Sequence, residues 1–165
     1  MIVGLVTAAI LAWGLVAWED MRRFEINPWF AGVAVLCATS AAALLPTASS
    51  SLVLFDPHWA AVVADRFAGA CIGLIAGFLT YHFQHRSFGQ GDIYIYGALF
   101  SVGGLEHILL TACLFGGFAF ATCLVYSSIR NKPFFRTGYP AGIPAAAAAV
   151  SMIAITFGLG DVFYA

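Results

Sequence analysis

The chain has 165 residues, of which 62% are apolar and only 9% are charged, and its formal net charge is −1. A soluble domain carries roughly 25% charged residues, so this composition excludes an ordinary water-soluble domain. The near-neutral charge gives no indication of a nucleic-acid partner. We therefore expect an all-α, polytopic membrane protein in which residues 1–165 form a single domain, one compact helix bundle.

The first apolar segment is Ile2–Trp18, which is long enough to cross a membrane because a spanning helix needs about 17–25 residues. No basic residue precedes it, and its positive charges, Arg22 and Arg23, follow it. A secretory signal peptide has the opposite order, with its positive charges before the apolar run. We expect a retained helix whose N-terminus lies outside the cell.

Two further spans follow. The segment Trp29–Leu45 is opened by Pro28 and closed by Pro46, and residues 46–65 are expected to form a loop. The third span, Phe67–Phe83, is rich in small residues, which favour close helix contact in lipid. These are Gly69, Ala70, Gly73, Ala76 and Gly77.

The apolar run from residue 93 to residue 129 is too long for one helix. Residues 103–107, Gly-Gly-Leu-Glu-His, divide it into a fourth span, Ile93–Val102, and a fifth, Ile108–Ile129. The fourth covers only about 15 Å as a helix, against a hydrocarbon layer of about 30 Å. We therefore expect it to begin below the interface, with Asp92 inside the membrane boundary. A basic loop leads to the sixth span, Ile143–Leu159.

Six spans with the N-terminus outside place three loops inside the cell: residues 19–28, 84–92 and 130–142. Six of the seven basic residues lie in these loops: Arg22, Arg23, Arg86, Arg130, Lys132 and Arg136. Only Arg66 lies on the other side, which agrees with the positive-inside rule. We expect a multi-pass protein of the inner (plasma) membrane, with Asp20 and Asp92 both at the cytoplasmic face.

The two aspartates are the candidate catalytic residues. Asp20 ends the first apolar segment and Asp92 precedes the fourth. Ionisable residues within membrane segments indicate a functional site, and paired carboxyl groups that share a proton activate water in aspartic proteases. The placement of both acids at one face of the bundle therefore predicts two-carboxylate hydrolysis.

Three motifs follow one another along the chain: Asp20-x-Arg22-x3-Ile26-Asn27-Pro28, Gly89-x-Gly91-Asp92 and Pro140-x-Gly142-x-Pro144. Together they resemble the type IV prepilin peptidases, and the chain is similar to the short Flp/Tad-pilus kind over nearly its whole length. That family's first motif reads Asp-x-Arg-x3-Ile-Pro-Asn, and its second reads Gly-x-Gly-Asp-x-Lys. In this chain two residues of the first motif are exchanged, as Asn27-Pro28, and Tyr94 replaces the lysine. These departures bear on local geometry, electrostatics and substrate range.

The resemblance implies an aspartic endopeptidase that cuts the short basic leader from a pilin precursor at the membrane face. Its catalytic residues would be Asp20 and Asp92, with the proline- and glycine-containing turn before the sixth span close to them. The residues expected to support the site are Gly89, Gly91, Asn27, Pro140, Gly142 and Pro144. For Asn27, capping of the second span is the expected role, with Pro28 at the first helical position.

The cysteines give no indication of a cofactor. Cys37, Cys71, Cys113 and Cys123 lie inside apolar segments, and none forms a C-x-x-C pair. Larger relatives carry a zinc-binding, cysteine-rich insertion and methylate their product, whereas this chain lacks room for that insertion. We expect no metal, no cofactor and no disulfide, and the sequence does not indicate an oligomeric state.

Two alternatives remain open. Presenilin-like and signal-peptide-peptidase-like enzymes also use Gly-x-Gly-Asp, but they have about nine spans and a Tyr-Asp motif where this chain has Glu19-Asp20. The other alternative is a small transporter or structural membrane protein whose paired acids bind a cation or a proton.

Overall fold

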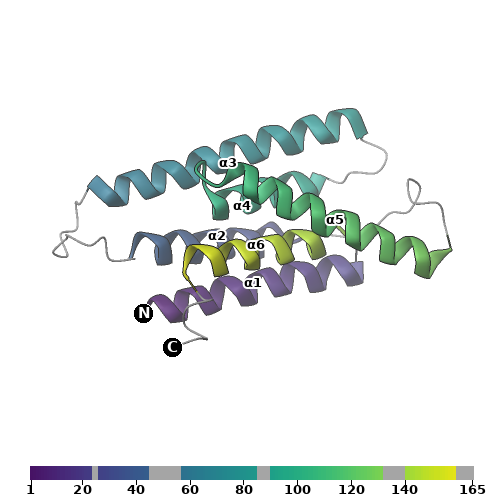
Figure 1. Ribbon diagram of the computed structural model, residues 1–165, viewed down its shortest axis with the longest axis horizontal. Coiled ribbons are helices and arrows are strands. Elements are labelled where there is room, and N and C mark those ends of the chain that lie inside the picture. Colours follow the sequence, from purple (N-terminus) through teal and green to yellow (C-terminus); the bar gives the residue numbers. More distant parts are fainter. Residues whose placement is uncertain (24–25, 45–56, 85–89, 132–139, 159–165) are drawn as a thin grey trace.

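The computed structural model describes residues 1–23, 26–44, 57–84, 90–131 and 140–158 of the chain. These residues form six α-helices and no strand (Figure 1), which confirms the predicted all-α bundle. The helices are α1 (Ile2–Arg23), α2 (Pro28–Ala43), α3 (Pro57–Gln84), α4 (Gln90–Gly103), α5 (Ile108–Arg130) and α6 (Gly142–Thr156).

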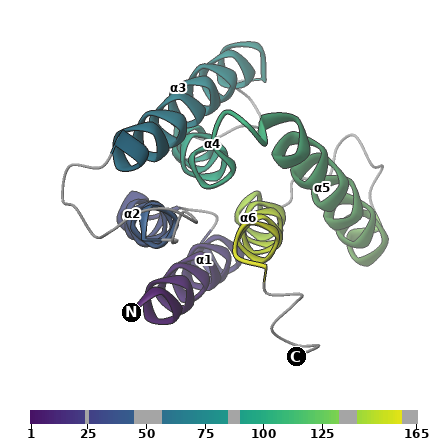
Figure 2. The same cartoon turned by 60° about the vertical axis from the view of Figure 1, so that its left-hand side comes forward.

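The short helix α4 lies at the centre of the bundle and contacts α2, α3, α5 and α6, as Figure 2 shows. On the far side of α2 and α6, α1 packs against both of them. Successive helices run in opposite directions, so α2, α4 and α6 begin at the end of the bundle where α1, α3 and α5 finish (Figure 1). This end, named here the aspartate end, carries both predicted catalytic residues.

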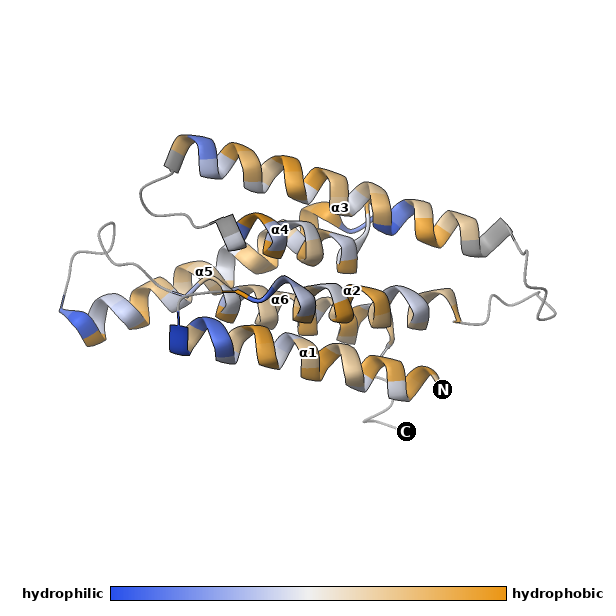
Figure 3. Cartoon of the chain, turned by 180° about the vertical axis from the view of Figure 1, so that it is seen from behind, coloured by the Kyte–Doolittle hydropathy of each residue, from blue (hydrophilic) through white to orange (hydrophobic). Residues whose placement is uncertain are grey.

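Within the part of the chain that the structure describes, three helices are long and apolar enough to cross a membrane: α1, α5 and the part of α3 from Ala60 to Phe83. Two more, α2 and α6, are apolar but shorter, with 16 and 15 residues. With 14 residues, α4 is about 21 Å long, which confirms the prediction of a short fourth helix. Figure 3 shows hydrophobic colours along most of each helix and hydrophilic colours mainly near helix ends.

The core of the bundle is built from small residues that allow helices to approach closely and from a few large residues between them. Alanines face inward on α2 and α6, where Ala34, Ala145 and Ala149 are fully buried. The largest fully buried side chains are Trp13, Ile95, Leu99, Met152 and Ile153. Van der Waals packing of this kind is the main attraction between helices in lipid.

The contact between α3 and α4 confirms the role predicted for the small residues of the third span. A Cβ atom added at Gly69 would lie 2.5 Å from the Phe100 carbonyl oxygen, and one at Gly73 would collide with the Tyr96 carbonyl. These glycines lie four residues apart, on one face of the helix. The backbones of α3 and α4 therefore touch directly, and no larger residue fits at this face.

The structure corrects the expected loop at residues 46–65, because α3 begins at Pro57 and includes Asp65 and Arg66. Asp65 contacts the turn between α4 and α5, and Arg66 contacts the last turn of α4. The Asp65 carboxylate accepts hydrogen bonds from the Leu105 and Glu106 backbone N–H groups, at 2.9 and 3.2 Å, and the Arg66 guanidinium donates to the Val102 carbonyl. Asp65 and Arg66 therefore belong to α3 although they are charged, because backbone groups at the end of α4 and in the turn after it supply their hydrogen-bond partners.

Candidate active site

The candidate site forms where α1 ends and where α2, α4 and α6 begin. The first residues of a helix have N–H groups without partners inside the helix, and the helix dipole makes this end favourable for negative charge. Three such ends, those of α2, α4 and α6, lie at the end of the bundle where α1 finishes (Figure 1). The arrangement suits carboxylates, and the two predicted catalytic aspartates lie here.

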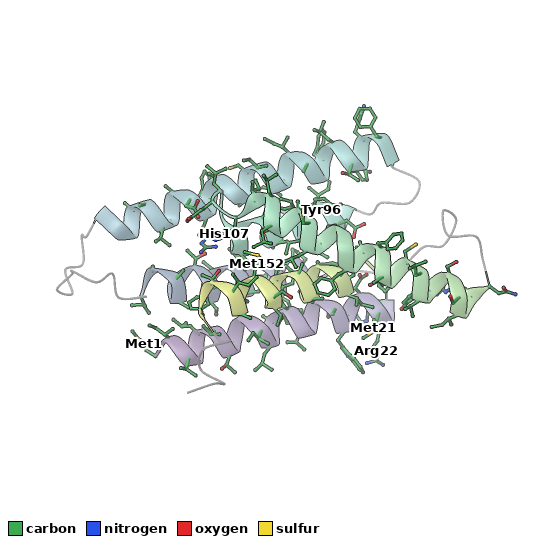
Figure 4. The ribbon with its side chains drawn as sticks, in the orientation of Figure 1. Met1, Met21, Arg22, Tyr96, His107 and Met152 are labelled. Atoms are coloured by element: carbon green, nitrogen blue, oxygen red, sulfur yellow. The ribbon has the colours of Figure 1, made fainter. Side chains whose placement is uncertain are left out.

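Asp20 belongs to the buried face of α1. It follows Trp13 and Val16, both fully buried, at helical spacings of three and four residues, and it is itself only 4% exposed. Its neighbours Met21 and Arg22 are exposed, and Figure 4 shows both directed away from the other helices. The Asp20 side chain therefore points into the bundle. Among the described residues it is the only charged side chain that is buried.

The arginine of the first motif has a different environment. The Arg22 guanidinium lies 5.5 Å from the centre of the Trp18 ring, on the outer face of α1. This cation–π contact keeps the arginine away from Asp20. The Arg22 guanidinium and the buried Asp20 carboxylate therefore lie on different faces of α1.

The buried carboxylate of Asp20 is held by the first residue of α6. Its Oδ2 atom accepts a hydrogen bond of 2.5 Å from the Gly142 backbone N–H. Glycine is required for this approach, because an added Cβ atom would lie 2.9 Å from Asp20 Cβ and 3.2 Å from the Val16 carbonyl oxygen. The turn before the sixth helix is thus in direct contact with Asp20.

Two prolines frame this contact. Pro140 and Pro144 are both fully buried, one before the helix and one in its first turn. Proline costs little in the first turn of a helix, because the N–H that it lacks would have no partner within the helix. The two rings fix the backbone on either side of Gly142 and so fix the direction of its N–H group.

Asp92 lies in the first turn of α4, and it is partly exposed. Its carboxyl group is close enough to that of Asp20 for the two to interact electrostatically. The structure therefore brings the two acids, 72 residues apart in the sequence, to one site. They differ in environment, since Asp20 is buried and contacts α6, whereas Asp92 is partly exposed.

The glycine motif packs against the connection between α1 and α2. A Cβ atom added at Gly91 would lie 3.3 Å from Ile26 Cβ, so the start of α4 and this connection are in close contact. Gly89, the other predicted glycine, lies outside the described residues. The importance of Ile26 as the packing partner of the second motif was not predicted, although this residue is part of the first motif.

The exchanged pair has a clear structural role. The Asn27 side chain accepts a hydrogen bond of 3.0 Å from the Trp29 backbone N–H and caps α2, and Pro28 is the first residue of the helix. These are the preferred positions for asparagine and proline at a helix start. The prediction that Asn27 caps the second helix is confirmed, and the order Asn-Pro starts the helix without strain.

Comparison of the chain with protein-family models, curated proteins and solved structures finds no match. The described residues contain no group of three or more His, Cys, Asp or Glu side chains that could hold a metal ion. Two carboxyl groups at one site offer acid–base chemistry. Such a pair can share a proton, with one group accepting a proton from water and the other donating one.

Proposed function

We propose that this protein is a membrane-embedded aspartic endopeptidase that removes the basic leader of a type IV (Flp-like) pilin precursor. The observation that carries the proposal is that Asp20 and Asp92 lie at the same end of an apolar helix bundle, close enough for their carboxyl groups to interact electrostatically. Their surroundings add support, since Asp20 is buried and oriented by the Gly142 N–H and Asp92 is accessible.

The proposed reaction needs only these two side chains and water. One carboxylate takes a proton from water, and the other carboxyl group, protonated, polarises the carbonyl of the scissile peptide bond. Attack of the hydroxide on the carbonyl carbon, with transfer of the second carboxyl group's proton to the carbonyl oxygen, gives a gem-diol. Its collapse breaks the C–N bond as a proton passes to the leaving amine, and the two carboxyl groups return to their shared-proton state.

The charge distribution supports a cytoplasmic aspartate end. Arg22, Arg23 and Arg130 lie in the last turns of α1 and α5, at this end, whereas Arg66 contacts the turn at the opposite end of α4. Positive charge accumulates on the cytoplasmic side of membrane proteins. The proposal therefore places the site at the inner face of the plasma membrane, where a leader would be cut.

The proposal is tested by co-expression of the protein with a candidate pilin precursor, followed by the mass of the product. Wild type should remove the leader, and Asp20→Asn and Asp92→Asn should leave the precursor intact at equal protein level. Glu19→Gln, next to Asp20, is the matched control for loss of a charge and should still cleave. Cleavage by neither wild type nor control over a panel of precursors would favour a transporter or structural protein whose acids bind a cation or proton.

A further inference from the structure

The backbone on either side of Asp92 makes a close contact with another part of the bundle. The preceding residue, Gly91, packs on Ile26, because a Cβ atom added at Gly91 would lie 3.3 Å from Ile26 Cβ and 3.7 Å from its Cδ1 atom. The following residue, Ile93, packs on α3, because a Cβ atom added at Gly77 would lie 3.0 Å from Ile93 Cα. The backbone that carries the Asp92 carboxyl group is therefore supported both by α3 and by the connection between α1 and α2.

The contact at Gly91 depends on the small size of glycine. Gly91 does not have a positive φ, so other residues could adopt its backbone conformation. A side chain at this position would instead meet Ile26, because 3.3 Å is shorter than the separation of about 3.5–4.0 Å between carbon atoms in ordinary contact. The glycine therefore lets the start of α4 lie directly on Ile26.

Ile26 is itself attached to a firmly held part of the bundle. Asn27, the next residue, caps α2, since its side chain accepts a hydrogen bond of 3.0 Å from the Trp29 N–H and its carbonyl accepts one of 3.2 Å from the Phe30 N–H. Pro28 has a fixed φ and restricts the conformation of the residue before it. The Ile26 side chain is half-buried and packs against the hydrophobic core. A shift of Ile26 would therefore disturb the start of α2.

We infer that Ile26 is a positioning residue, which holds the backbone of Asp92 at the place where its carboxyl group reaches that of Asp20. The inference rests on the proposed function and adds which side chain sets the geometry of the acid pair. Asp20 belongs to the end of α1, and Ile26 belongs to the connection that follows it. One short stretch of chain thus carries the first acid and supports the second. Because both carboxyl groups act on the same water and the same peptide bond, a contact that fixes their separation controls the rate of the reaction.

The inference is tested by shortening this side chain in the full-length protein in lipid nanodiscs. Ile26→Ala removes the atoms beyond Cβ, and the control Ile10→Ala makes the same change at a half-buried residue of α1 that packs against the same core. Ile26→Ala should lower kcat for precursor cleavage about ten-fold or more and leave KM near the wild-type value, whereas Ile10→Ala should change neither. Ile26→Val, which keeps the branched Cβ, should recover most of the loss. Equal kcat values for Ile26→Ala and Ile10→Ala would overturn the inference while leaving the proposed function intact.

A second measurement replaces the packing contact with a covalent bond. In a cysteine-free background, Ile26→Cys and Gly91→Cys place two Cβ atoms 3.3 Å apart, close to the spacing of about 3.5–4.5 Å in disulfides. The pair should cross-link on oxidation, and the oxidised form should cleave faster than the reduced form, because the bond holds the start of α4 on the connection. Loss of cleavage on oxidation, restored by a reductant, would show that the contact opens during the reaction and would overturn the inference. Absence of cleavage by wild type would instead overturn the proposed function.

Discussion

The contact between Gly142 and Asp20 gives the sharpest prediction for a single small substitution. In Gly142→Ala the new Cβ atom would lie 2.9 Å from Asp20 Cβ and 3.0 Å from its Oδ2 atom. Carbon atoms in ordinary contact lie about 3.5–4.0 Å apart, so the approach is too short by about 0.6 Å or more. Overpacking of this kind costs about 1–3 kcal/mol, so the bundle should still fold.

The same shift would disturb the site. Moving the start of α6 away from α1 by that amount stretches the 2.5 Å hydrogen bond to about 3.1 Å, near the upper limit for N–H···O bonds. Misplacement of a reacting group by about 1 Å costs on the order of 10²-fold in rate. We therefore expect Gly142→Ala to lower the cleavage rate by about 10- to 100-fold.

The assay is the initial rate of precursor cleavage by purified protein in lipid nanodiscs, with equal amounts of folded protein. Gly14→Ala is the matched control, because Gly14 lies on the same helix as Asp20 and its added Cβ atom meets nothing within 4 Å. Alanine also has the higher helix propensity, so a loss of rate in Gly142→Ala cannot arise from a weaker helix. Equal rates for the two variants would refute the argument that Gly142 positions Asp20.

Three other predictions concern folding, local chemistry and orientation. Gly73→Leu should separate α3 from α4 and so lower both the yield and the melting temperature of the protein in detergent. The control Gly116→Leu, on an open face of α5, should change neither. Equal melting temperatures for the two variants would contradict the packing of α3 on α4. Tyr94→Lys, which introduces at an exposed position the lysine that prepilin peptidases have in their second motif, should retain cleavage, and complete loss in a well-inserted protein would show that Tyr94 has a packing role. In a cysteine-free background, a thiol reagent applied from outside should label Ser50→Cys and leave Phe134→Cys unlabelled, and the reverse pattern would invert the orientation.

The helices could be predicted from the sequence because apolar length and breaking residues are local signals. The break at Gly103 and Gly104 was predicted from the glycine pair, and the structure places Gly104 at a φ of +69°, a conformation that glycine adopts readily. The early start of α3 was missed, because Asp65 and Arg66 resemble the end of a span when seen alone. Their partners lie about 40 residues further along the chain, and only the fold brings them together.

The candidate site was predictable in part. The order of the loops placed Asp20 and Asp92 at one face, and the structure brings them to the same end of the bundle. The hydrogen bond from Gly142 to Asp20 joins residues 122 positions apart, and no local pattern specifies it.

The central claim is that Asp20 and Asp92 act together in one hydrolytic step. It is tested most directly by the cleavage rates of Asp20→Asn, Asp92→Asn and the double variant on one synthetic precursor in nanodiscs. Residues that act as a unit give losses that do not add, so each single variant should lose detectable cleavage and the double variant should be no worse. Near wild-type cleavage by either single variant would contradict the claim.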